Sequence, residues 1–407
     1  MRHKWRRDAL ARPARSRDRV PAEARLLLLT AGGAENDAAI RELAHSGLDW
    51  PRFVGLAQRE RAVPVVYTRL RNVVADAIPA DVSDQMRRLA LVSDFAMLHL
   101  ESRLHESLRA LDSAQVRVML LKGAALAHTA YAGFCQRPMS DLDVLVDAGN
   151  AQLARQLMLE KGWREVEGDM SVHRYDRHHH LPPLRDAQLP ELQLEIHTAL
   201  FPERQPFAFD TRDVWAGAQA LGPMFPNTYV PNAMHSLLHA CLHFLWSHEG
   251  RFGVWRTIRD VDALARTGNV DWSAFVAAAR ATRGGTSCYW TFRIAQRTAG
   301  VSVPGFVLDE LRPPRSGSVL DALERHFAQS LFSAAFACPS VSLDHALWEL
   351  AVMPGWSGHG KIRPWDEYPA FMGPGGPSKS RSALRRERIR RFLASLGYIR
   401  MLLRTGD

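Results

Sequence analysis

Two aspartates, Asp141 and Asp143, are the residues best placed to do chemistry, because they open the short apolar run DLDVLV. The alternation of residues over 141–146 predicts a β-strand, and side chains on a strand alternate with period two, so both carboxylates must lie on one face. Two adjacent like charges raise each other's pKa, and a divalent cation removes that cost. Carboxylate oxygens at this spacing suit Mg²⁺, which also takes water and substrate phosphates. An isolated pair of this kind is often only two solvated aspartates at the start of a strand. The surrounding elements must therefore decide between that and a metal site.

The elements before the aspartates would bring a turn and a helix to the same place. Residues 116–121 form an apolar run too short for a helix, which predicts a buried strand that ends at Lys122 and Gly123. Gly123 permits a sharp turn without a Cβ clash, and the apolar residues that follow it have helical spacing.

A later segment offers a third carboxylate. Residues 173–184 and 191–200 are predicted to form an antiparallel hairpin joined by a loop at 185–190. In its second strand Glu195 alternates with the apolar residues and faces away from them. It is either a metal-facing carboxylate or an ordinary exposed glutamate on an edge strand.

The order of strand, glycine turn, helix and D-x-D strand resembles the nucleotidyltransferase superfamily typified by DNA polymerase β and kanamycin nucleotidyltransferase. More narrowly, LLKGAAL, RPMSDLDVLV, EKGW and LEIH resemble an uncharacterised bacterial nucleotidyltransferase family within it. The resemblance covers about residues 25–266 and is specific over 120–197. One departure is Gly123-Ala124 where the superfamily has Gly-Ser or Gly-Gly, so a hydroxyl that could touch phosphate is absent. Backbone N–H groups at a helix start can still bind phosphate.

The resemblance implies an α+β fold: a small mixed sheet of the polymerase-β type with helical regions before and after it. It implies a Mg²⁺-dependent transfer of a nucleoside monophosphate from an NTP to a hydroxyl of a small molecule, a peptide or protein, or an RNA end. Two Mg²⁺ ions, with Mn²⁺ as the alternative, would be held by the catalytic residues Asp141, Asp143 and Glu195. The nucleotide would be bound by Lys122, Gly123, Ala124, Arg137 and Ser140. Arg137 is equally explained as a surface residue, and a catalytically degenerate nucleotide- or partner-binding protein of the same fold is the alternative function.

Replacing either aspartate by asparagine is expected to abolish transfer. Removing one anion from a like-charged pair is also expected to stabilise the metal-free protein.

Composition limits the class of protein without choosing its substrate. The 407 residues, 46% of them hydrophobic, can bury a sizeable core. The net charge of +9 favours an anionic partner such as a nucleotide, a nucleic acid or an anionic surface. The four scattered cysteines indicate neither a disulfide framework nor a cysteine zinc site, which fits a cytoplasmic protein, and no apolar run is long enough to span a membrane.

The pattern of charge, proline, glycine and apolar spacing predicts six segments along the chain. They are a disordered basic tail at 1–21, a helical region at 22–111, the nucleotidyltransferase core at 112–205, a helical domain at 228–355, a Gly/Pro-rich loop at 356–380 and a basic amphipathic helix at 381–407. The last helix would either bind an anionic membrane or nucleic acid, or dock on its own domain with a solvated arginine face.

Histidines recur every four residues at His235, His239 and His243, which places them on one helix face. No carboxylate or cysteine nearby completes four zinc ligands. The row is therefore predicted to line a helix interface or a nucleotide-facing surface and to hold no zinc. Farther along this helical region, Arg256 and Arg259 could reach a nucleotide or face solvent.

Overall fold

The computed structural model describes residues 20–166, 178–203, 205–332, 338–353 and 381–404. Within them a seven-stranded mixed sheet has the order β3-β4-β5-β2-β1-β7-β6. The strands are β1 (Val118–Leu120), β2 (Asp141–Val146), β3 (Trp163–Glu165), β4 (Leu184–Asp186), β5 (Gln193–His197), β6 (Gln219–Ala220) and β7 (Thr228–Val230). The predicted α+β class with a mixed sheet is confirmed.

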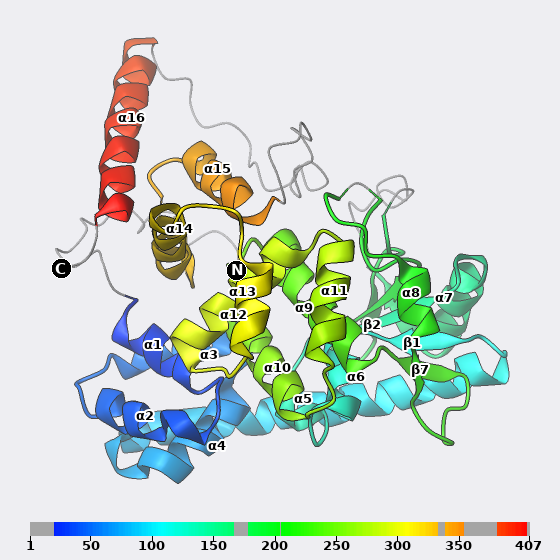
Figure 1. The fold of residues 1–407 in the computed structure, drawn as a ribbon. Helices are drawn as coiled ribbons and strands as arrows, with labels where there is room; N and C mark the ends of the chain where they lie inside the picture. Colours follow the sequence, from blue (N-terminus) through cyan, green and yellow to red (C-terminus); the bar gives the residue numbers. More distant parts are fainter. Residues whose placement is uncertain (1–19, 167–177, 204, 333–337, 354–380, 405–407) are drawn as a thin grey trace.

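Helices surround this sheet and make up most of the remaining described chain (Figure 1). Those before β1 are α1 (Ala22–Leu29), α2 (Asp37–Ala44), α3 (Trp50–Arg59), α4 (Val63–Val74) and α5 (Ala80–Ser113). Those within the sheet region are α6 (Lys122–Thr129), the 3-10 turn η4 (Phe134–Gln136), α7 (Ala151–Glu160) and α8 (Thr211–Ala216). Those after it are α9 (Ala233–Leu242), α10 (Val254–Arg266), α11 (Trp272–Ala281), α12 (Gly285–Ala299), α13 (Gly305–Leu311), α14 (Gly317–Ser330), α15 (Val341–Val352) and α16 (Arg381–Leu403).

The long helix α5 joins two hydrophobic cores. Its first half contributes Met86 and Ala90 to a core built from helices, and its second half contributes Leu100 and Leu104 to the core under the sheet. Figure 1 shows α5 extending from α4 to the strands. A helix apolar along its whole length on one side can serve both cores, because residues three and four apart lie on one face.

The helices before and after the sheet share a single core. Side chains of α1 to α4 and of α9 to α15 belong to one cluster of buried apolar residues. Polar contacts join the same elements: Asn36 Nδ2 donates to the Ala299 carbonyl at 2.7 Å, and Trp255 Nε1 donates to Thr30 Oγ1 at 3.0 Å. The two helical regions listed separately from the sequence therefore pack together beside the sheet.

The predicted hairpin is partly wrong in its boundaries. β4 and β5 are antiparallel, as expected, but Arg185 and Asp186 lie in β4 and not in the loop. Asp186 is buried, and His99 and Arg103 of α5 compensate its charge by binding the carboxylate at 2.9 and 2.7 Å. Aspartate favours turns, so Asp186 is expected in a loop from its type alone. Its partners on α5 stabilise it in a strand instead. Residues 173–177 of the predicted first strand lie outside the described residues.

The C-terminal helix α16 touches the remainder of the described chain near its end. Tyr398 Oη lies 3.0 Å from Nδ1 of His326 on α14, and Leu402 is buried there. Phe392 and Leu393 are exposed. This contact is docking on its own domain, while an anionic partner for its arginines stays a prediction. Residues 1–19 of the tail expected at 1–21, and the whole of the loop expected at 356–380, lie outside the described residues. No helix in the described part has the length and apolar content needed to cross a bilayer.

One buried ion pair fastens the sheet region to α10. The guanidinium of Arg137 donates two hydrogen bonds to Asp260, at 2.6 and 2.7 Å, and Tyr131 Oη donates to the same carboxylate at 2.7 Å. Both ionic side chains are less than a tenth exposed. Removing one member of a buried pair leaves an uncompensated charge, which is far more costly than losing a surface pair.

We expect Asp260→Asn to lower the free energy of unfolding by about 3 kcal/mol, the low end for breaking a buried pair. Asp321→Asn, on the exposed side of α14, is the matched control and should change it by less than about 0.5 kcal/mol. Urea unfolding of both variants measures the difference. Equal midpoints for the two variants would contradict the anchoring role of Asp260.

Candidate active site

The three predicted acidic residues meet because β2 and β5 are neighbours in the sheet. The strands are parallel, and their register places Asp143 beside Glu195 and Asp141 beside Gln193. Side chains of paired residues lie on the same face of a sheet. The alternation expected for Asp141, Asp143 and Glu195 thus becomes one face with three carboxylates.

Asp143 is the centre of the site. Its Oδ1 accepts hydrogen bonds from Lys122 Nζ at 2.7 Å and from His197 Nε2 at 2.9 Å. Asp143 and His197 are almost completely buried, and Lys122 is partly exposed. Lys122 reaches Asp143 from the first residue of α6, where its φ of 47° makes the turn after β1. That positive φ is uncommon for a residue with a Cβ and is found where surrounding structure requires it.

The turn is therefore made by Lys122 and not, as the sequence predicted, by Gly123. Gly123 lies in a closely packed position: a Cβ there would lie 3.0 Å from Met139 Sδ and 3.4 Å from Arg137 Nη1. The side chain of Ala124 is buried in the sheet core. Phosphate binding by the backbone of Gly123 and Ala124 stays a prediction.

The two aspartates have opposite electrostatic environments. Burial and the charges of Asp143 and Glu195 raise the pKa of Asp141 above its ordinary value of 3.8. Burial alone would also raise the pKa of Asp143, but the charge of Lys122 and the hydrogen bond from His197 hold it well below 3.8. Burial would lower the pKa of Lys122, and the nearby carboxylates outweigh it and raise that pKa above 10.5. At neutral pH Lys122 is thus a cation bound to an anion.

Glu195 belongs to the same network. Its Oε2 lies 3.4 Å from His197 Nε2 and 3.9 Å from His180 Nε2. Burial would raise the pKa of Glu195, but the hydrogen bond from His197 lowers it below 4.5. Burial would lower the pKa of His197, whereas its hydrogen bonds to Asp143 and Glu195 raise it above 6.5. His197 therefore holds both carboxylates in the charged form.

These residues fit a divalent cation. One ligand atom each from Asp143, Glu195 and His197 lie within 4.8 Å of one another, and Asp141 adds a further carboxylate on the same face. Like charges this close need a cation, and the ammonium of Lys122 supplies one positive charge. The carboxylates are hard oxygen donors of the kind that Mg²⁺ and Mn²⁺ take.

The remaining predicted nucleotide ligands lie close by but have protein partners. Arg137 is buried and paired with Asp260, as described above. Ser140 Oγ lies 3.4 Å from Asp141 Oδ1, and the Ser140 carbonyl accepts the Gln193 N–H at 2.8 Å, which extends the contact between β2 and β5. Nucleotide contacts by Arg137 and Ser140 stay predictions.

Arg256, on the first turn of α10, is more available for an anion. Among the described residues it forms no ion pair, and its Nε is buried without a hydrogen-bond partner. Burial and the charge of Arg137 lower its pKa, while Asp141 and Glu60 act in the opposite direction. The Nε of Arg259 is likewise buried without a hydrogen-bond partner, but its guanidinium lies over the rings of Tyr131 and Trp255 at 5.4 and 5.6 Å. Only the tertiary structure separates these two arginines.

The histidine row lines a helix interface next to the site. α9 packs on α6, and His239 lies edge-on to Phe201 at 5.1 Å while His243 contacts the ring of His248 at 4.3 Å. Burial lowers the pKa of His239 to about 3 and that of His243 well below 6.5, so both are neutral at pH 7. The helix continues as a π-turn over His243–Ser247, a form common at functional sites. That the histidine row holds no zinc stays a prediction.

His197 was not assigned a role from the sequence, although a signal was present. It follows Glu195 by two residues in an alternating strand, so both side chains must share a face. The partner of Lys122 could not be found in this way, because no local spacing in the sequence connects Lys122 with Asp143.

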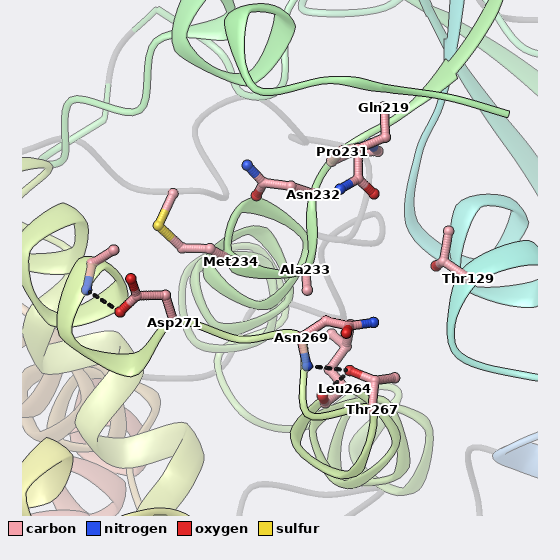
Figure 2. A pocket seen from close by; sticks show the side chains of 11 residues that line it. Thr129, Gln219, Pro231, Asn232, Ala233, Met234, Leu264, Thr267, Asn269 and Asp271 are labelled. Carbon is pink, nitrogen blue, oxygen red and sulfur yellow. Dashed lines mark hydrogen bonds between the residues drawn. The ribbon is translucent and has the colours of Figure 1, made fainter.

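A pocket of about 430 Å³ lies away from the carboxylates. Figure 2 shows its lining residues at the end of α6, the start of α9 and the junction of α10 with α11, with Thr129, Asn232 and Asn269 among them. Lys122 and Thr129 are the two ends of α6, which at eight residues is about 12 Å long. The pocket is therefore separate from the acidic site.

Comparison with known proteins identifies a family for most of this region. A family model described as an uncharacterised nucleotidyltransferase matches residues 46–300, more than half of the chain. No curated protein and no solved structure matches.

The contrast between the aspartates gives a prediction that corrects the sequence-based one. Without divalent cations at pH 7, Asp141→Asn should raise the free energy of unfolding, because it removes a carboxylate whose charged form is disfavoured. Asp143→Asn should instead lower it, by about 3 kcal/mol, because Lys122 and His197 lose their shared partner. Urea unfolding in a chelator measures both.

The pH dependence provides an internal check. Asp143 has a folded pKa below 3.8, so its stabilisation is present above that pH and is lost as the pH falls through the folded pKa. The effects of both variants should shrink in acid. Asp147→Asn, just beyond β2 and exposed, is the control and should shift stability by less than about 0.5 kcal/mol. Equal effects of Asp141→Asn and Asp143→Asn would refute the assignment of Lys122 to Asp143.

Proposed function

We propose, since the chain belongs to the uncharacterised nucleotidyltransferase family, that it transfers a nucleoside monophosphate from an NTP to a hydroxyl acceptor. The observation that carries this proposal is the face shared by Asp141, Asp143 and Glu195 on two adjacent parallel strands. The order of strand, turn, helix and acidic strand, with the third carboxylate on a neighbouring strand, supports a polymerase-β-type core. Two Mg²⁺ ions, or Mn²⁺, would bind there.

The chemistry that bound Mg²⁺ supplies is stabilisation of the attacking and leaving oxygens of an in-line phosphoryl displacement. Asp141 and Asp143 would hold the ions, and Glu195 would complete the ligand set on the acceptor side. His197, which bonds both Asp143 and Glu195, would keep these carboxylates charged and oriented.

A divalent cation bound to Asp143 would replace Lys122 as the partner of that carboxylate. Lys122 would then be able to bind a phosphate of the substrate. Its ammonium is a compact charge on a flexible stem, which can turn from the carboxylate to a phosphate oxygen. Arg256, with no ion pair among the described residues, would bind the same triphosphate from α10. The carboxylates alone would repel the phosphates of the substrate. Two cations at the rim of the site would attract these phosphates.

A catalytically degenerate protein of the same fold is the second candidate. Ala124 in place of a hydroxyl residue and the close Lys122–Asp143 pair both favour it. The two candidates differ in turnover and not in binding.

The four described free thiols are compatible with the proposed cytoplasmic location.

The function is tested by incubating the full chain with each of four α-³²P-labelled NTPs, Mg²⁺, and pools of small molecules, protein or RNA as acceptors. Transfer of label that requires Mg²⁺ and disappears in Asp141→Asn would support the enzyme. Tight NTP binding with no label transferred to any pool would favour the degenerate alternative.

Within that assay, Glu195→Gln should reduce turnover by about 10²-fold or more while changing nucleotide affinity little, because its role is on the acceptor side. Glu191→Gln is the matched control, since Glu191 is exposed just before β5. Nucleotide affinity measured by equilibrium dialysis separates the two effects. Loss of affinity with unchanged turnover would show that the acceptor-side role is wrong.

A further inference from the structure

Three consecutive histidines lie beside the acidic site without a part in the proposed reaction. The chain bends at His178 and His179, and His180 pairs with His197 in an antiparallel bridge. The N–H of Leu181 donates to the Ile196 carbonyl at 2.8 Å, so this segment runs along the end of β5. The sheet thereby brings the three histidines to the strand that carries Glu195.

The bend gathers the imidazoles into one cluster. The ring centre of His178 lies 4.5 Å from that of His179 and 4.1 Å from that of His180. One nitrogen from each of the three lies within 4.8 Å of the others. In a regular strand His178 and His179 would point to opposite faces, so their convergence is a property of this bend.

Two buried nitrogens beside this cluster have no partner in the described part of the chain: Nδ1 of His179 and Nδ1 of His197. Their rings are 5.2 Å apart. A buried polar atom without a hydrogen bond is costly, and two such imidazole nitrogens in one place indicate a missing ligand that accepts lone pairs.

We infer that His178, His179 and His180 form a binding site for a transition-metal ion of the Zn²⁺ class, adjacent to the carboxylate site and distinguished from it by three imidazole ligands. Imidazole nitrogens bind Zn²⁺, Co²⁺ or Ni²⁺ in preference to Mg²⁺, which selects oxygen. Zn–N bonds of about 2.0–2.1 Å require nitrogens about 3.4 Å apart in a tetrahedron, so side-chain shifts of about 1 Å complete the site. Glu195 Oε2, 3.9 Å from His180 Nε2, is the available fourth ligand.

Such an ion would clamp the segment 178–181 to the end of β5. The clamp would fix Glu195 from the side opposite Asp143, because Glu195 lies between His180 and the carboxylate pair. Its binding energy would add to folding stability, since the ligands converge only in the folded chain. This site does not depend on whether the chain transfers nucleotides.

The test uses the full chain stripped with a chelator and titrated with Co²⁺, whose visible ligand-field bands report nitrogen coordination. We expect one Co²⁺ per chain to remain bound when a large excess of Mg²⁺ occupies the carboxylate site, to be displaced by Zn²⁺, and the midpoint of thermal unfolding to rise with Zn²⁺. Loss of a residue that only hydrogen-bonds a metal ligand weakens metal binding by about 10–100-fold. His179→Gln removes a ligand itself and should weaken Co²⁺ binding by at least that factor. The triple variant His178→Gln, His179→Gln, His180→Gln should abolish the bands.

Two controls keep the result decisive. His45→Gln removes an exposed histidine on the far N-terminal helices and should leave Co²⁺ binding unchanged. Circular dichroism checks the fold, and the single variant His179→Gln decides if the triple variant does not fold. Bands that persist in the triple variant, bands lost equally in His45→Gln, or Co²⁺ that Mg²⁺ displaces would overturn the inference.

Discussion

The mutual repulsion of three carboxylates is the constraint on which this structure depends. Asp141, Asp143 and Glu195 share one face of two adjacent strands, and water cannot screen them fully at that depth. The protein compensates with partners of its own: the ammonium of Lys122 binds Asp143, and His197 hydrogen-bonds both Asp143 and Glu195. Asp141 has no such partner among the described residues, and its raised pKa records that difference.

The scaffold explains how these charges are held in place. Lys122 makes the turn from β1 into α6 in a strained conformation, which delivers its ammonium to the neighbouring strand. Behind it, the Arg137–Asp260 pair binds the loop before β2 to α10. This pair connects the acidic strand with α10, and the first turn of α10 also places Arg256 near the carboxylates.

Histidines form a second layer around this unit. His239 and His243 are neutral side chains in the packing of α9 and the turn after it, whereas His197 is a hydrogen-bond partner of two carboxylates, which raise its pKa. The same residue type thus serves two purposes, decided by whether a carboxylate or an aromatic ring is adjacent. The cluster at 178–180 differs from both, because its imidazoles face one another.

Local spacing in the sequence determined much of the site. Alternation placed Asp141 with Asp143 and placed Glu195 away from its apolar neighbours, and the same rule would have placed His197 with Glu195. Tertiary structure alone decided that β5 lies beside β2, that Lys122 binds Asp143, that Arg137 belongs to Asp260, and that the helices on both sides of the sheet share one core. The physical reason is that a strand's period fixes which face a side chain takes, whereas the partner across that face depends on pairings between residues 20 to more than 200 positions apart, which no local periodicity encodes.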